Sequence, residues 1–193
     1  MQNNKVLIIG GPTGSGESTI TNALVEKYPL FKRLVTATSR AKRSGETDKQ
    51  NYYFFTKEEF EKNIASGNIL EHTYIENRDT YYGTYKPDLE QKLQSGYVIV
   101  NVDYVGVLYY KKHYNALAIF IKPESIESLA ERLKKRNPEM TEQELSMRLE
   151  NAENEIRNEE EYYDYSVINA DNCLNEAIQK VEAILKSHGF QLN

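Results

Sequence analysis

Residues 6–19 read VLIIGGPTGSGEST, and this stretch decides the fold. Its first four residues, Val6 to Ile9, form a continuous apolar run that two glycines close, which is typical of a central parallel strand covered on both faces. A glycine-rich turn follows, and a helix is predicted from about Ser18 to Lys27. A buried strand, a glycine loop and a helix in this order indicate an α/β protein with a central parallel sheet.

Residues 11–18 have the spacing of a P-loop, G-x-x-x-x-G-K-[ST], with Glu17 at the position of the lysine. In such a loop the glycines let backbone N–H groups turn inward around phosphate oxygens, and the helix N-terminus adds its positive dipole end. The alternative is a glycine turn that only connects strand to helix. Four glycines at positions 10–16 and the hydroxyl pair Ser18-Thr19 favour phosphate binding, with Ser18 as a magnesium ligand that Thr19 supports. The candidate phosphate-binding residues are Gly11, Pro12, Thr13, Gly14, Ser15, Gly16, Ser18 and Thr19.

The rest of the chain alternates between strand and helix patterns. Capping boxes at Thr56/Glu59 and Thr141/Glu144 mark two helix starts, and turn residues 77–79 join two β-rich stretches in a hairpin. The later alternation predicts a parallel sheet with right-handed crossovers. The expected strands cover 52–55, 69–76, 80–85, 97–102, 116–121 and 167–168. The expected helices cover 56–67, 87–94, a short segment between 102 and 116, a segment from 125, and the segments carrying Leu145 to Ile156 and Leu174 to Leu185.

Composition limits the classes of function. The formal net charge of −5 argues against a nucleic-acid binder, and tyrosine pairs such as Tyr109-Tyr110 fit half-buried packing better than base stacking. The single cysteine, Cys173, cannot form an intramolecular disulfide, and no Cys/His cluster has zinc-ligand spacing. The first apolar run is too short for a signal peptide or a membrane span. We expect one cytoplasmic domain, monomeric or homodimeric, with no nucleic-acid or membrane partner.

A second group of candidate binding residues lies in residues 36–46, TATSRAKRSGE, which Tyr52 follows. Arg40 and Arg43 stand three positions apart beside hydroxyl side chains, so both guanidinium groups are able to hydrogen-bond one phosphate. Taken alone, the segment also fits an exposed basic loop. Together with the P-loop upstream, it predicts a second phosphate site.

Five motifs in this order resemble the guanylate kinase family over about Val6 to Leu185. The resemblance implies a three-layer P-loop NTPase-type α/β fold with a central parallel sheet, an inserted small mixed α/β GMP-binding subdomain at 36–86 and a helical lid at 132–157. The core would comprise residues 1–35, 87–131 and 158–193. The motifs are the P-loop, Thr38-Ser39-Arg40-x-x-Arg43-x-Gly45-Glu46 with its tyrosine, Leu70-Glu71, Tyr81-Tyr82-Gly83-Thr84 and Asp103-x-x-Gly106.

The resemblance implies the reaction ATP plus GMP to ADP plus GDP, in purine nucleotide metabolism, with Mg²⁺ accompanying ATP. Guanine presents N1–H and its N2 amine side by side, and one carboxylate accepts from both, whereas adenine offers no such pair. Glu71 would therefore select GMP over AMP, although it also fits an ordinary exposed acid at a strand end. The implied GMP-binding residues are Arg40, Arg43, Tyr52 and Tyr82 on the phosphate, Thr36, Glu71 and Thr84 on the base, and Asn101 and Asp103.

Arginines near the lid are further implied catalytic groups. Arg132, Arg136 and Arg148 would act with Arg40 on the transferring phosphates, or else they are helix-surface residues. Asn169 falls where the family contacts adenine. No general base is needed, because the attacking phosphate oxygen of GMP is already largely ionised near neutral pH. Catalysis would consist of aligning two anions while cations neutralise their charge.

Glu17 is a departure from the family pattern: it stands where the family has the lysine that spans the ATP phosphates. Unit charges about 4 Å apart interact by roughly 4 kcal/mol at an effective dielectric near 20, so charge reversal there costs several powers of ten in rate. Three explanations for Glu17 stay open. It is an introduced substitution, or the chain is a natural enzyme in which lid arginines or another lysine replace the missing charge, or the chain is a divergent protein that binds GMP without turning it over. The alternative function is therefore a catalytically impaired guanylate-kinase-like protein that binds GMP or a phosphorylated partner without turnover.

Overall fold

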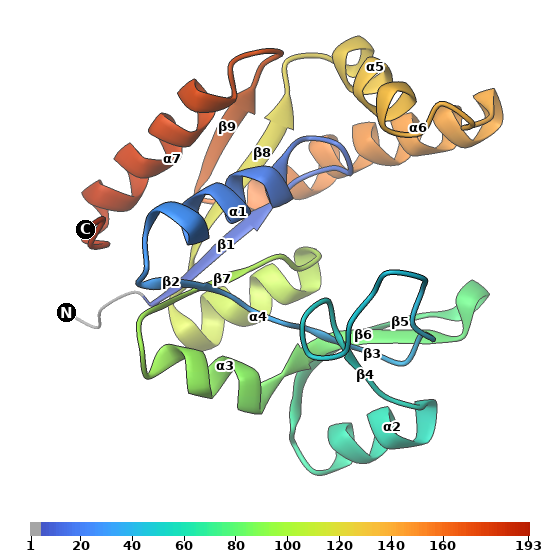
Figure 1. Ribbon diagram of the computed structural model, residues 1–193, viewed down its shortest axis with the longest axis vertical. Coiled ribbons are helices and arrows are strands. Elements are labelled where there is room, and N and C mark those ends of the chain that lie inside the picture. The colour runs from blue at the N-terminus through green and yellow to red at the C-terminus, as the bar shows by residue number, and fades with distance from the viewer. Residues whose placement is uncertain (1–4) are drawn as a thin grey trace.

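A five-stranded parallel sheet forms the centre of the computed structural model, which describes residues 5–193 (Figure 1). Residues 1–4 of the predicted core lie outside the described part. The strand order is β2-β7-β1-β8-β9, so β1, which contains the first apolar run, occupies the middle position, and all five residues of β1 are buried. The strands are β1 (Val6–Gly10), β2 (Phe31–Arg33), β7 (Tyr97–Val100), β8 (Leu117–Pro123) and β9 (Tyr165–Asn169).

Helices cover both faces of this sheet. Leu7 and Ile9 pack in one buried cluster with α1 (Glu17–Lys27) and α7 (Leu174–Ser187). Val6 and Ile8 point the other way and pack in a second cluster with α3 (Lys86–Leu93) and α4 (Tyr104–Tyr114). This arrangement confirms the predicted three-layer α/β fold. None of the helices in the described part of the chain combines the length and the apolar character needed to cross a membrane.

A second sheet of four strands lies beside the central sheet, at the lower right in Figure 1. Its order is β4-β3-β6-β5, and the β5–β6 pair is the predicted antiparallel hairpin, connected by the 3-10 helix η1 (Glu76–Arg78). The Thr56/Glu59 capping box is present at the start of α2 (Lys57–Ala65), which packs on this sheet. The strands are β3 (Ala37–Thr38), β4 (Tyr53–Phe54), β5 (Ile69–Ile75) and β6 (Thr80–Tyr85), so the strand predicted over 52–55 is shorter than expected.

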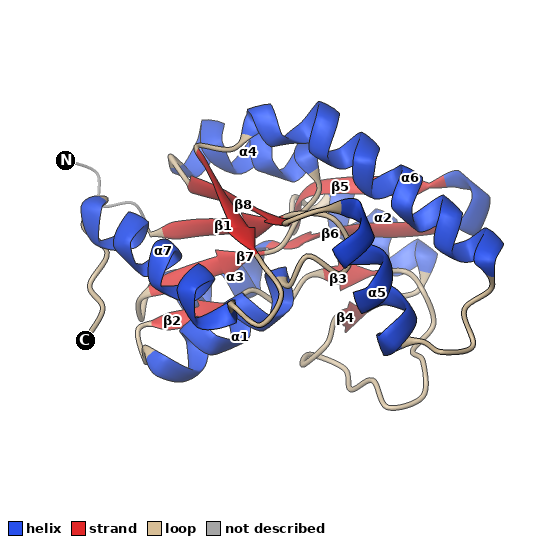
Figure 2. Cartoon of the chain, turned by 90° about the horizontal axis from the view of Figure 1, so that it is seen from above, coloured by secondary structure: helices blue, strands red, loops and turns tan. Residues whose placement is uncertain are grey.

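Two further helices, α5 (Ile126–Arg136) and α6 (Glu142–Glu159), project beside the sheet and pack against each other (Figure 2). Leu129, Leu133 and Leu145 are buried between them, as their helical spacing predicted. The Thr141/Glu144 capping box is confirmed at the start of α6, and η2 (Glu160–Tyr162) then leads into β9. The P-loop, the second sheet and the α5–α6 pair therefore surround one region at the carboxyl ends of the central strands.

Candidate active site

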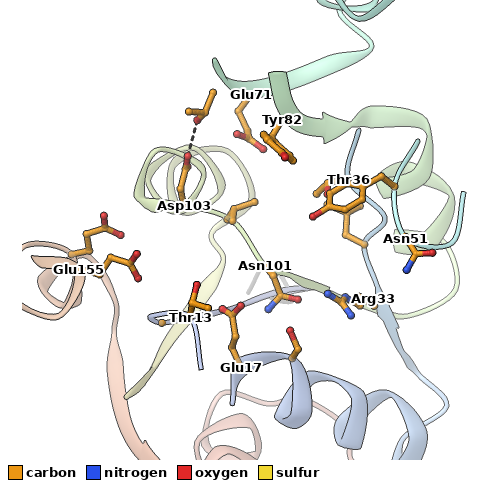
Figure 3. Close-up of a pocket in the computed structure, with 18 of the residues that line it drawn as sticks. Thr13, Glu17, Arg33, Thr36, Asn51, Glu71, Tyr82, Asn101, Asp103 and Glu155 are labelled. Carbon is orange, nitrogen blue, oxygen red and sulfur yellow. Dashed lines mark hydrogen bonds between the residues drawn. The ribbon is translucent and has the colours of Figure 1, made fainter. Parts of the chain in front are cut away.

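A cavity of about 600 Å³ lies between the P-loop and the second sheet (Figure 3). Ligands of open parallel sheets bind outside the carboxyl ends of the strands, and this cavity has that position. The P-loop contributes Gly11, Thr13, Glu17 and Ser18 to its lining, and the second sheet contributes Glu71 and Tyr82. Further predicted site residues in the lining are Thr36, Tyr52, Asn101 and Asp103.

The P-loop backbone is shaped by its glycines and by one distant amide. Gly16 has φ +100°, and a Cβ there would lie 2.3 Å from Asn169 Nδ2. That nitrogen donates to the Ser15 carbonyl oxygen at 2.7 Å, so Asn169 supports the loop from β9. Ser15 Oγ is buried and has no hydrogen-bond partner among residues 5–193. Gly11, Gly14 and Gly16 all have positive φ, the conformation that a tight phosphate-binding turn requires of its glycines.

Glu17 begins α1 and points into the cavity near Asn101 (Figure 3). Burial raises the pKa of its carboxyl to about 7, the Arg33 guanidinium opposes this shift, and the negative charge of Glu155 adds to it. The pKa of Glu155 is also raised to about 7, by burial and then by the negative charge of Glu159. Arg33 is the one cationic side chain in the cavity lining described here, so carboxylates outnumber cations around Glu17.

These shifts predict a pH-dependent stability. Glu17 keeps its proton in the folded chain up to about pH 7 but loses it near 4.5 when unfolded, so the folded state binds more protons in that window. Stability is therefore expected to fall as pH rises from about 4.5 to about 7. The Glu17→Gln variant should gain on the order of 2 kcal/mol over the parent at pH 8 and nothing at pH 4. Urea unfolding at both pH values checks this, with Glu153→Gln as an exposed control; an equal gain at both would contradict it.

The predicted phosphate-binding arginine is held by an acidic neighbour. Arg40 forms two hydrogen bonds of 2.8 Å to Glu46, and its guanidinium lies 5.4 Å from the ring centroid of Tyr52. Hydrogen bonds from Arg40 and from the Arg43 backbone lower the pKa of Glu46 to about 2. Tyr52 also packs edge to face with Tyr82. Arg40, Tyr52 and Tyr82 therefore form one cluster, of which the two tyrosines line the cavity and Arg40 lies just outside it. The Arg43 side chain is exposed and also lies outside the lining.

The predicted base-reading carboxylate lies at the far end of the cavity. Glu71 is 8 % exposed, and Thr84 Oγ1 donates to its Oε1 at 2.6 Å. Burial raises the pKa of Glu71 to about 7, the Thr84 hydrogen bond opposes this, and the nearby charge of Asp103 adds to it. Glu71 is therefore a buried acid in the site and not an exposed residue at a strand end.

Asn101 and Asp103 face the same cavity from the end of β7. Asn101 Nδ2 donates to the Ile9 carbonyl oxygen at 2.7 Å, while its Oδ1 is buried without a partner in the described chain. Asp103 caps α4 by accepting from the Gly106 N–H, and it also accepts from Thr73 Oγ1 at 2.6 Å. Both side chains are thus fixed by the protein before any ligand binds.

The predicted lid arginines differ in their positions. Arg132 donates to Asp171 at 2.7 Å and to the Asn169 carbonyl oxygen at 2.7 Å, and it lines a smaller cavity of about 250 Å³ behind the P-loop with Gly14, Gly16 and Thr19. Arg136 and Arg148 are exposed and line neither described cavity. Their contact with phosphates stays a prediction.

Sequence reasoning missed Arg33, Asp171 and Glu155 as members of the site. Arg33 ends β2 and Asp171 follows β9 by two residues, and the carboxyl end of a parallel strand is a position that could have indicated both. Glu155 carries no local signal, because only the path of α6 brings it toward Glu17. The role of Glu46 as the partner of Arg40 was not inferred either, although the residue belongs to the quoted motif.

Comparison with known proteins agrees with this geometry. A family model described as guanylate kinase matches residues 3–188. The chain is 40% identical over 181 residues to a guanylate kinase of Protochlamydia amoebophila, covering 93% of this chain and 89% of the relative, and 42% identical over 188 residues to one of Clostridium perfringens, covering 95% and 84%. The crystal structure of guanylate kinase from Anaplasma phagocytophilum superposes with a TM-score of 0.71 at 26% identity, covering 99% of this chain and 89% of that one. The chain therefore belongs to the guanylate kinase family.

Proposed function

We propose that the chain transfers the γ-phosphoryl group of ATP to GMP, giving ADP and GDP. The observation that carries the proposal is the arrangement around one cavity, which Glu71, the P-loop, Tyr52 and Tyr82 line, with Arg40 packed against Tyr52 just outside the lining. A nucleoside monophosphate in this space would present its base to Glu71 and its phosphate toward the P-loop.

The Glu71 end would recognise guanine. An ionised carboxylate accepts hydrogen bonds only, and the N1–H and N2 amine of guanine donate side by side. Thr84 occupies one lone pair of Glu71 and leaves the others for the base, and Thr36 lines the same cavity. Adenine would place the acceptor N1 against the carboxylate, so the site favours GMP over AMP.

The phosphate groups would meet between the second sheet and α1. Arg40, Tyr52 and Tyr82 would bind the acceptor phosphate, for which Arg40 exchanges at least one hydrogen bond to Glu46. The P-loop N–H groups would bind ATP. The residue set fits Mg²⁺, because the Ser18 hydroxyl lines the cavity and Mg²⁺ takes its remaining oxygen ligands from phosphates and water. When bound, the ion would supply positive charge against the transferring phosphoryl group.

Transfer would depend on alignment and charge, not on a proton-transfer residue. We propose that residues 36–86 and 132–157 close over the substrates and exclude water, which would bring the exposed Arg136 and Arg148 toward ATP. Arg132 already lies beside the P-loop through its bonds to Asp171 and Asn169. The cytoplasmic location and the monomeric or dimeric state remain predictions.

Glu17 favours a second candidate function, in which the chain binds GMP or a phosphorylated partner without turnover. Its carboxyl lies where ATP phosphates would approach, in a part of the cavity that already contains Glu155 and Glu159. The two candidates share the GMP site and differ only at the P-loop.

Calorimetric titration with GMP and AMP, run beside a magnesium-dependent kinase assay, tests the proposal. We expect GMP to bind at least about 100-fold more tightly than AMP, because adenine leaves the buried Glu71 unpaired. Formation of GDP would establish the kinase function. Selective GMP binding without GDP would establish the second function, and equal affinity for both nucleotides would refute the base-reading role of Glu71.

A further inference from the structure

Tyr110 carries a polar hydroxyl into the core beneath the base-reading end of the cavity. Its side chain is 0 % exposed and packs among apolar residues of the α3–α4 layer. The hydroxyl lies 2.8 Å from Thr84 Oγ1, and that same Thr84 oxygen lies 2.6 Å from Glu71 Oε1. Three oxygens from α4, β6 and β5 therefore form one continuous hydrogen-bond chain that ends at the cavity.

The direction of this chain follows from its donors. Thr84 has one proton, and an ionised Glu71 is only able to accept, so Thr84 donates to Glu71. The Tyr110 hydroxyl must then donate to Thr84. If Thr84 donated to Tyr110 instead, Glu71 would have to carry a proton and donate it to Thr84. Because burial holds the pKa of Tyr110 well above its ordinary value, the phenol keeps the proton that it donates.

Glu71 depends on this support because its other surroundings disfavour its charge. It is buried, and the charged group that acts on it is the carboxylate of Asp103, which is repulsive. A proton on Glu71 would turn one of its acceptors into a donor. That pattern clashes with the adjacent N1–H and N2 amine of guanine and matches the acceptor N1 and donor N6 of adenine.

We propose that Tyr110 is a specificity-determining positioning residue, which acts through Thr84 to hold Glu71 with two acceptors toward a purine that presents two adjacent donors. This inference rests on the proposed binding of GMP. Tyr110 does not touch the base. It fixes the orientation of the Thr84 hydroxyl, and Thr84 fixes the carboxylate.

The test compares binding of GMP and IMP to the parent chain and to Tyr110→Phe by calorimetry. Hypoxanthine keeps the N1–H of guanine but lacks the N2 amine, so IMP loses one of the two donors that Glu71 reads. We expect Tyr110→Phe to weaken GMP binding about 10-fold and IMP binding less than about 3-fold. The larger loss corresponds to one buried hydrogen bond, and it falls on GMP because only GMP uses both acceptors of Glu71. Tyr114→Phe is the control, because Tyr114 is on the same helix and packs 5.4 Å from Tyr110.

Thr84→Val breaks the chain at its middle and extends the test. In that background Tyr110→Phe should have no further effect on the GMP to IMP ratio, because Tyr110 then has no route to Glu71. If Tyr110→Phe does not fold, Thr84→Val alone must lower the ratio about 10-fold.

Several results would overturn the inference. An unchanged GMP affinity in Tyr110→Phe, an equal loss for GMP and IMP, or a persistent effect of Tyr110→Phe in the Thr84→Val background would each do so. These results leave the proposed function intact when the parent chain still prefers GMP. A parent chain that binds neither nucleotide would remove the proposed function and this inference together.

Discussion

Replacement of Glu17 by lysine is expected to raise GDP formation from ATP and GMP by at least about 100-fold, with little change in GMP affinity. The carboxyl of Glu17 points into the P-loop end of the cavity, where Glu155 and Glu159 also lie. Above about pH 7, where Glu17 is ionised, a lysine there would exchange repulsion of the ATP phosphates for attraction. One unit-charge contact at about 4 Å is worth roughly 4 kcal/mol at an effective dielectric near 20, and screening by water reduces this without reversing its sign.

The measurement is steady-state kinase kinetics with ATP varied at saturating GMP and then the reverse. Glu17→Gln removes the negative charge without adding a positive one, so its rate should lie between those of the parent and Glu17→Lys. A rate for Glu17→Lys at or below that of the parent would show that other groups already compensate for Glu17. In that case Arg33, whose charge already acts on Glu17, is the first candidate.

Replacement of Arg40 by alanine is expected to weaken GMP binding about 1000-fold. Two charge-assisted hydrogen bonds to a phosphate contribute roughly 1.5–3 kcal/mol each. The loss also exposes a second effect, because Glu46 is then left without its 2.8 Å partner and faces the acceptor phosphate as a free carboxylate. Calorimetric titration with GMP measures the total effect.

The double variant Arg40→Ala/Glu46→Ala separates the two effects. It should recover about 10-fold of the lost affinity, because it removes the unpaired carboxylate and restores nothing else. Arg157→Ala, an exposed arginine of α6, is the control and should bind GMP like the parent. If the single and double variants bind GMP equally weakly, Glu46 has no electrostatic influence on the acceptor site.

Much of the fold could be predicted because its signals are local. The run at Val6–Ile9 is apolar at every position, which requires burial on both faces, and β1 indeed occupies the middle of the sheet. The capping boxes at Thr56 and Thr141 define helix starts through bonds between neighbours three residues apart. Such features need no knowledge of the rest of the chain.

The site was less predictable because its contacts join distant residues. Asn169 was expected at adenine, yet its amide nitrogen is engaged by the P-loop, an arrangement that depends on β9 lying next to β8. Tyr110 was assigned to half-buried packing, whereas it is fully buried and hydrogen-bonded to Thr84, because nothing in a helix pattern shows which strand residue will face it. Motif spacing identified the residue types in the cavity but not their partners.

The bond from Asn169 to Ser15 also sets an order of events during synthesis of the chain. The two residues are 154 positions apart, and Asn169 belongs to the last strand of the sheet. A ribosome releases the P-loop residues first, but the amide that supports their backbone emerges only when most of the chain has been made. The phosphate site, although its motif stands near the N-terminus, therefore lacks this backbone support in a nascent chain until β9 has joined the sheet.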